Sequence, residues 1–254
     1  MADEARVVLV TGGGRGIGRA ISLGLAEDGF DVAVNYRKDE EAAAKTVADV
    51  QALGRRAASF QASVDDYDQD VAMVEGVLST FGHVDALVNN AGVPGRGGLV
   101  SDTDLGDFER VMGTIALGAF YLCKLVVPHL RERGRGDIVM VSSQSTVSFD
   151  PYGSPYNMAK SAQEALAYTL AQEEAANGIR VNIVGAGLSN TDMGRRLVKG
   201  AFGADDIHQL DGKFGLGRVN EPEDVAGVVR FLLSPAGAQV TGQRYALDGG
   251  GFKA

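Results

Sequence analysis

The sequence has one cysteine, Cys123, and fewer basic than acidic residues: 24 Lys and Arg against 33 Asp and Glu, for a formal net charge of −9. A single cysteine excludes an internal disulfide and fits a reducing compartment. Because an acidic surface repels phosphate polymers, we expect no nucleic-acid partner. The apolar stretch around Cys123 favours plain packing for this side chain.

Long apolar runs and metal-ligand clusters are also missing. No uninterrupted run approaches the roughly 18 apolar residues that cross a bilayer, so we expect no membrane span. The segment 1–10 has neither the layout nor the cleavage site of a secretion signal, so we expect a cytoplasmic protein. His83, His129 and His208 lie far apart, and no spacing of His, Cys and carboxylates suggests a metal site, so we predict none.

What is abundant is glycine, with 35 of 254 residues, alongside an ordinary 45% of hydrophobic residues. This length and composition suit one large α/β domain, which we place at 1–254. Short apolar segments alternate with helical ones, a pattern typical of βαβ units. The predicted strands are Arg6–Val10, Val32–Tyr36, Ala57–Gln61, Asp85–Asn89, Asp137–Ser142, Ile179–Val184 and Arg244–Leu247. The predicted helices are Gly16–Gly29, Glu40–Leu53, Tyr67–Phe81, Asp104–Leu130, Tyr156–Asn177 and Glu223–Leu233.

This alternation predicts a single-domain Rossmann fold, a doubly wound parallel sheet of about seven strands with helices on both faces. The segment 188–219 shows no clear pattern. An irregular segment of this length inside a compact domain is usually functional, and we interpret it as a substrate lid.

A glycine-rich loop, TGGGRGIG at Thr11–Gly18, follows the first predicted strand and begins the first helix. Glycines let the backbone approach a pyrophosphate closely, and a helix N-terminus offers free N–H groups. The alternative is a tight strand-to-helix turn without a ligand. The strand–loop–helix context favours dinucleotide binding.

The segment VSSQSTVSFDPYGSPYNMAK carries candidate acid–base residues. Tyr156 and Lys160 are four residues apart on a predicted helix and share one face. Ser154 is the expected N-cap, which puts Tyr156 at the positive end of the helix. A neighbouring ammonium favours the phenolate, so we expect a lowered pKa for Tyr156 and proton transfer near neutral pH. Tyr152 has no lysine four residues on.

Ser143 lies thirteen residues before Tyr156, at the end of a predicted strand, and Ser142 is the competing serine. The glycine-loop spacing, NNAG at Asn89–Gly92 and Ser…Tyr-x-x-x-Lys together resemble the short-chain dehydrogenase/reductase family over nearly the whole chain, most closely its 3-oxoacyl-[acyl-carrier-protein] reductases and related ketoreductases. The resemblance implies that Ser143 binds the substrate oxygen, Tyr156 is the general acid/base, and Lys160 also holds the nicotinamide ribose.

The resemblance further implies a set of cofactor contacts. They fall on the glycine loop, the ends of the second to fourth strands, the catalytic helix and the stretch after the sixth strand: Gly12, Arg15, Gly16, Ile17, Gly18, Tyr36, Arg37, Ser63, Val64, Asn89, Ala91, Gly92, Tyr156, Lys160, Gly187 and Thr191.

The second predicted strand ends in Tyr36, where NAD-specific sites commonly have an acid, and Arg37 follows. A guanidinium binds a ribose 2′-phosphate bidentately, whereas a carboxylate repels it. By resemblance, Arg15 reaches the same phosphate. The sequence therefore favours NADP(H), with NAD(H) as the alternative.

Two positions depart from the family pattern. Many relatives have an Asn in the long central helix that completes a water relay from the lysine; here the position is Ile115. An isoleucine relays no proton, so Lys160 needs another route. The usual Pro-Gly after the sixth strand is Ala186-Gly187, which loosens the cofactor-capping loop.

These observations predict an NADP(H)-dependent oxidoreductase that reduces a ketone such as a 3-oxoacyl thioester. The alternatives are an NAD(P)-dependent dehydrogenase of a sugar, polyol or other secondary alcohol, and a non-catalytic cofactor-binding regulator. The expected partner is a small carbonyl or alcohol substrate, with a carrier-linked one as an option. The resemblance also implies a homotetramer or homodimer.

Overall fold

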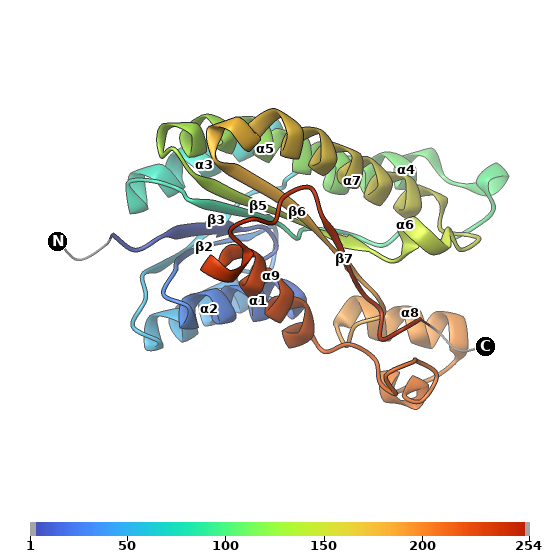
Figure 1. The fold of residues 1–254 in the computed structure, drawn as a ribbon. Helices are drawn as coiled ribbons and strands as arrows, with labels where there is room; N and C mark the ends of the chain where they lie inside the picture. Colours follow the sequence, from blue (N-terminus) through green and yellow to red (C-terminus); the bar gives the residue numbers. More distant parts are fainter. Residues whose placement is uncertain (1–3, 252–254) are drawn as a thin grey trace.

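The computed structural model describes residues 4–251, and these contain one sheet of parallel strands in the order β3-β2-β1-β4-β5-β6-β7 (Figure 1). The strands are β1 (Val7–Val10), β2 (Asp31–Tyr36), β3 (Ala57–Gln61), β4 (Ala86–Asn89), β5 (Gly136–Ser143), β6 (Ile179–Ala186) and β7 (Arg244–Leu247). The strand order reverses between β1 and β4, which in doubly wound sheets is where ligands bind at the carboxyl ends of the strands. The predicted Rossmann fold is confirmed.

Helices cover both faces of the sheet. The helices are α1 (Gly16–Glu27), α2 (Glu40–Ala52), α3 (Tyr67–Phe81), α4 (Leu105–Met112), α5 (Gly118–Glu132), α6 (Ser145–Ser148), α7 (Ser154–Glu174), α8 (Asp192–Phe202) and α9 (Pro222–Leu233). Figure 1 shows α3, α5 and α7 on one face and α1, α2 and α9 on the other.

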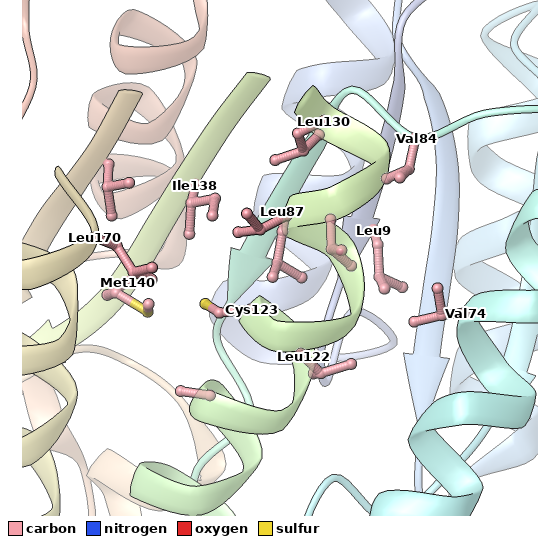
Figure 2. Close-up of a cluster of buried hydrophobic side chains, with 14 of the residues drawn as sticks. Leu9, Val74, Val84, Leu87, Leu122, Cys123, Leu130, Ile138, Met140 and Leu170 are labelled. Carbon is pink, nitrogen blue, oxygen red and sulfur yellow. The ribbon is translucent and has the colours of Figure 1, made fainter. Parts of the chain in front are cut away.

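Side chains of the first strand alternate between two hydrophobic cores. Val7 and Leu9 pack with α3, α5 and α7, whereas Val8 and Val10 pack with α1 and α9. All four are fully buried, as expected for a strand covered on both faces. Figure 2 shows the first core, in which α5 lies across the middle strands through Leu122, Cys123 and Leu130. Burial raises the pKa of the Cys123 thiol to about 12, which agrees with its expected packing role.

The predicted helix Asp104–Leu130 is interrupted. α4 and α5 are joined by a π-helical turn, Gly113–Leu117, which contains Ile115. The combined stretch Leu105–Glu132 is long and apolar enough to cross a membrane by length and composition alone. Half of its most apolar 18-residue window is buried inside the protein, and the buried side chains pack between the sheet, α3 and α7.

The segment 188–219 is more ordered than its sequence pattern suggested. It contains α8 and a small hydrophobic cluster of its own, made by Val198, Ile207, Leu210, Phe214 and Val219. The Asn220 N–H donates to the Leu188 carbonyl at 3.0 Å. The two ends of the segment are thus joined, and α8 projects beyond the sheet at its carboxyl edge (Figure 1).

Candidate active site

The glycine loop between β1 and α1 leaves no space for side chains where the helix begins. Gly12 and Gly16 have φ of +60° and +51°, in the left-handed region that favours glycine. A Cβ on Gly18 would lie 2.2 Å from the Gly12 carbonyl oxygen. Arg15 is the N-cap residue of α1, and its side chain makes no capping hydrogen bond. The loop therefore presents bare backbone and a helix N-terminus, which suit a pyrophosphate.

Thr11 joins this loop to the NNAG segment after β4. Its hydroxyl oxygen accepts hydrogen bonds from the backbone N–H groups of Asn90 and Ala91, both at 2.9 Å. The Asn90 amide in turn donates to the Thr11 carbonyl at 2.8 Å. The structure thus brings the carboxyl ends of β1 and β4 together. We did not single out Thr11 or Asn90 from the sequence, although both lie inside the two quoted motifs.

The remaining NNAG residues lie at the same edge. Asn89 is buried and its amide donates to the Cys123 sulfur at 3.5 Å, so it contacts the core. A Cβ on Gly92 would lie 3.9 Å from Ile115, which puts this turn beside the π-helical segment.

An exposed cation follows β2 directly, and another lies in the glycine loop. Tyr36 is partly buried, and the side chains of Arg15 and Arg37 are exposed. Arg15 lies 4.0 Å from the Asp192 carboxylate, while Arg37 forms no ion pair within residues 4–251. The last residue of β2 is Tyr36 and not an acid, so no carboxylate stands there to repel a 2′-phosphate.

The segment after β3 lies against the central helix. The Ser63 N–H donates to Gln69 at 2.9 Å, and its hydroxyl donates to Asp65. Val64 is buried, and a Cβ on Gly118 would lie 2.6 Å from the Val64 carbonyl oxygen. Glycine at position 118 thus permits the close approach of this segment to α5.

Ser143, Tyr156 and Lys160 lie together at the carboxyl end of β5. Ser143 ends that strand, and Tyr156 lies in the first turn of α7, capped by Gly153 instead of the expected Ser154. The side chains of Ser143 and Tyr156 form a hydrogen bond. The Lys160 ammonium lies 5.9 Å from the centre of the Tyr156 ring. The adjacent Ser142 is buried, and its hydroxyl donates to Glu164 at 2.6 Å, away from this group.

Burial dominates the proton affinities of the pair. It raises the pKa of Tyr156, and the hydrogen bond from Ser143 acts in the opposite direction. Our expectation that Lys160 lowers the pKa of Tyr156 is therefore wrong for the protein alone, because desolvation outweighs it. Burial also lowers the pKa of Lys160 to about 7, against the nearby Glu164 carboxylate, which raises it. Tyr156 therefore stays protonated near neutral pH, whereas Lys160 titrates close to it.

A charged network holds the backbone of Ser143. The Glu164 carboxylate accepts hydrogen bonds from Thr146 at 2.9 Å and from the Arg244 guanidinium at 3.0 Å. Arg244 also donates to the Ser143 carbonyl at 3.0 Å. A residue of the last strand therefore fixes the backbone of Ser143. Sequence reasoning missed Glu164 and Arg244 because only the fold places β7 next to β6.

The two departures from the family pattern are structurally ordinary. Ile115 is fully buried and packs with Val111 and Ala159 beside Tyr156. Ala186 pairs with Ser143 across β5 and β6 and with Leu247 across β6 and β7. It thus continues the strand that a proline would end.

Gly187 and Thr191 begin the segment that leads to α8. A Cβ on Gly187 would lie 2.9 Å from the Leu247 carbonyl oxygen, so the backbone is held close to β7. Thr191 caps α8 by accepting from the Gly194 N–H at 3.1 Å, and its methyl group would be 3.4 Å from a Cβ on Gly16. The segment 188–219 therefore begins directly beside the glycine loop. Within residues 4–251, no group of His, Cys, Asp and Glu could hold a metal ion.

Comparison with known proteins agrees with this geometry. Residues 12–251 match the family described as "Enoyl-(Acyl carrier protein) reductase". The chain belongs to the short-chain dehydrogenase/reductase family. It is 36% identical to the 3-oxoacyl-[acyl-carrier-protein] reductase of Synechocystis sp., over 98% of both chains.

Two solved structures are similar over nearly the whole chain. One is an NAD⁺-bound xylitol dehydrogenase, with a TM-score of 0.90, 32% identity, and coverage of 98% of this chain and 100% of the other. The other is a short chain dehydrogenase from Burkholderia cenocepacia in complex with NADP, with a TM-score of 0.87, 35% identity, and coverage of 96% and 97%. The relatives thus include proteins with either cofactor.

Proposed function

We propose that the protein is an NADP(H)-dependent reductase of ketones, most similar in action to a 3-oxoacyl-thioester reductase. The observation that carries this proposal is the position of Ser143, Tyr156 and Lys160 beside a glycine loop that presents a bare helix N-terminus. The similarity to 3-oxoacyl-[acyl-carrier-protein] reductases over the whole chain supports the same substrate class.

The residues at the edge of the sheet fit a dinucleotide with a 2′-phosphate. The glycine loop presents bare backbone N–H groups and the N-terminus of α1, which suit a pyrophosphate. The exposed guanidinium groups of Arg15, in this loop, and Arg37, directly after β2, could pair with a 2′-phosphate. When bound, the nicotinamide supplies or accepts the hydride. Lys160 would hold its ribose, and Thr191 lies beside the glycine loop that would hold its phosphates.

In the proposed mechanism, Ser143 donates a hydrogen bond to the substrate carbonyl oxygen and polarises it. Tyr156 gives its proton to this oxygen as negative charge develops there, and burial of Tyr156 keeps the phenol protonated until then. The positive charge of Lys160 stabilises the phenolate that remains. The same groups run in reverse for alcohol oxidation, with Tyr156 as the base.

The segment 188–219 is proposed to close over the substrate. Leu197 and Phe202 of α8 are more than half exposed, which suits contact with an apolar substrate chain. Arg195 pairs with Asp192 at 2.6 Å, so this charge is engaged within α8. We also propose that the substrate can be linked to a carrier.

A homotetramer or homodimer is also proposed. Leu117 and Phe120 are 47% and 50% exposed between α4 and α5 and at the start of α5, and Phe231 contacts Tyr245 edge to face at the β7 edge of the sheet. Two such apolar faces suit two-fold contacts between copies. Light scattering at micromolar concentration tests this, and a monomer would reject it. The cytoplasmic location stays a prediction.

Fluorescence titration with NADPH and NADH, followed by absorbance decay with a panel of ketones and 3-oxoacyl thioesters, tests the proposal. We expect tighter NADPH binding and turnover of at least one 3-oxoacyl thioester. Turnover only of polyols with NAD⁺ would favour the alcohol dehydrogenase, which the similarity to a xylitol dehydrogenase supports as the second candidate. Binding without any turnover would favour a non-catalytic regulator.

A further inference from the structure

Lys160 has two fixed acceptors in the protein. Its ammonium donates to the Val141 carbonyl at 2.6 Å and to the side-chain oxygen of Gln163 at 3.1 Å. Lys160 is 3% exposed and Gln163 1% exposed, so the second contact replaces hydration of a buried cation. A hydrogen bond to a buried charged group contributes far more than one on the surface.

Gln163 is closely packed on the side of Ile115. Gln163 and Ile115 line the same narrow crevice, with Thr11 and Asn89 on its other walls, and the crevice has no space for a water molecule. Ile115 itself offers the lysine no polar atom. At this position many relatives have an asparagine, whereas here an amide from the lysine's own helix lies at the ammonium.

We propose that Gln163 is a positioning residue for Lys160, which it holds through a direct hydrogen bond to the ammonium. With one N–H on Val141 and one on Gln163, the ammonium keeps its third N–H for the nicotinamide ribose. An amide neither gains nor loses a proton near neutral pH, so Gln163 orients the lysine and carries no proton. The proposal rests on the proposed function in that Lys160 serves a bound nicotinamide cofactor.

Other charged groups near Lys160 are accounted for in the test. The Glu164 carboxylate favours its protonated form, Arg244 pairs with that carboxylate at 3.0 Å, and the Tyr156 ring lies on the adjacent turn. Changes confined to Gln163 leave all three in place. Gln172, exposed on the same helix, provides a matched control through Gln172→Leu.

The experiment measures NADPH affinity by fluorescence between pH 6 and 9 for wild type, Gln163→Leu, Gln163→Glu and Gln172→Leu. Loss of one hydrogen bond to a buried cation predicts about tenfold weaker binding for Gln163→Leu. As the pH rises, the NADPH affinity of Gln163→Leu should fall at a lower pH than that of wild type. The reason is that the ammonium has lost an acceptor and gives up its proton more readily. Gln163→Glu keeps an acceptor of the same size and adds a negative charge beside the ammonium. The fall in NADPH affinity should therefore occur at higher pH than in wild type.

Turnover is then measured with any ketone that the wild type reduces. We expect kcat to fall in Gln163→Leu and to recover in part when Ile115→Asn is added, because the asparagine admits the missing polar group. Equal affinity and equal pH dependence of Gln163→Leu, Gln163→Glu and wild type would overturn the proposal. If the leucine variant does not fold, Gln163→Glu alone decides through its pH shift. A wild type that binds NADPH but reduces no ketone contradicts the proposed function, and the binding arm still decides the role of Gln163.

Discussion

Replacing Asp70 should stabilise the protein, and increasingly so as the pH rises. Asp70 lies in the first part of α3, is fully buried, and neither of its carboxyl oxygens has a hydrogen-bond partner. Burial and the charges of Asp65 and Asp66 raise its pKa from 3.8 to about 8. At neutral pH this carboxyl is therefore mainly protonated in the folded protein and ionised in the unfolded chain.

The sign and size follow from linkage. Between pH 4 and pH 8 the folded state binds the extra proton, so this group's contribution to the free energy of unfolding falls as the pH rises and levels off above about 8. At about 1.4 kcal/mol per pH unit, roughly three units up to pH 7 correspond to about 4 kcal/mol. Asp70→Asn removes this titration while keeping the shape of the side chain.

Urea unfolding of wild type and Asp70→Asn at pH 5, 6.5 and 8 measures the difference directly. We expect the advantage of the variant to grow by several kcal/mol across the series. Asp68→Asn, exposed on the same helix, is the control and should give a small, constant difference. A pH-independent difference for Asp70→Asn would refute the reasoning, because it would mean that the carboxyl titrates equally in both states.

Two further perturbations test the site. Arg244→Leu leaves the buried Glu164 carboxylate without its cation, so we expect the free energy of unfolding to fall by about 3 kcal/mol. We also expect a lower kcat, because the backbone of Ser143 loses a hydrogen bond. Unchanged stability in urea unfolding would contradict the described network. Arg37→Asp removes a cation and adds a negative charge that repels a 2′-phosphate. We therefore expect NADPH affinity to fall at least about tenfold and NADH affinity to rise. Equal losses of affinity for both cofactors would show that Arg37 does not recognise the phosphate.

The parallel sheet of about seven strands could be predicted from the sequence because short apolar strands and glycine-ended helices carry strong local signals. The interruption at Gly113–Leu117 was missed. Val111, Ile115, Ala119 and Cys123 repeat every four residues, and at 3.6 residues per turn such a row drifts by about 40° at each step. The π-helical turn offsets this drift and keeps the four side chains facing the core. The strict four-residue spacing was therefore the sequence feature that could have predicted the π-helical turn.

The site was predictable only where its residues belong to motifs. Ser143, Tyr156 and Lys160 follow from the resemblance to the family pattern Ser…Tyr-x-x-x-Lys, and the structure brings them together. Gln163 is one more polar residue on a helix until the fold buries it next to Lys160, and Arg244 meets the site only through strand pairing. Contacts of this kind depend on tertiary structure and leave no local pattern.

The most direct test of the proposed function compares wild type with Tyr156→Phe, measuring NADPH binding and ketone-dependent NADPH oxidation in the same samples. Phenylalanine keeps the ring that packs with Val111, Ile115 and Ala159 but removes the proton donor. The proposed mechanism predicts unchanged NADPH affinity and a loss of turnover of at least about a hundredfold. Full turnover in Tyr156→Phe would contradict it.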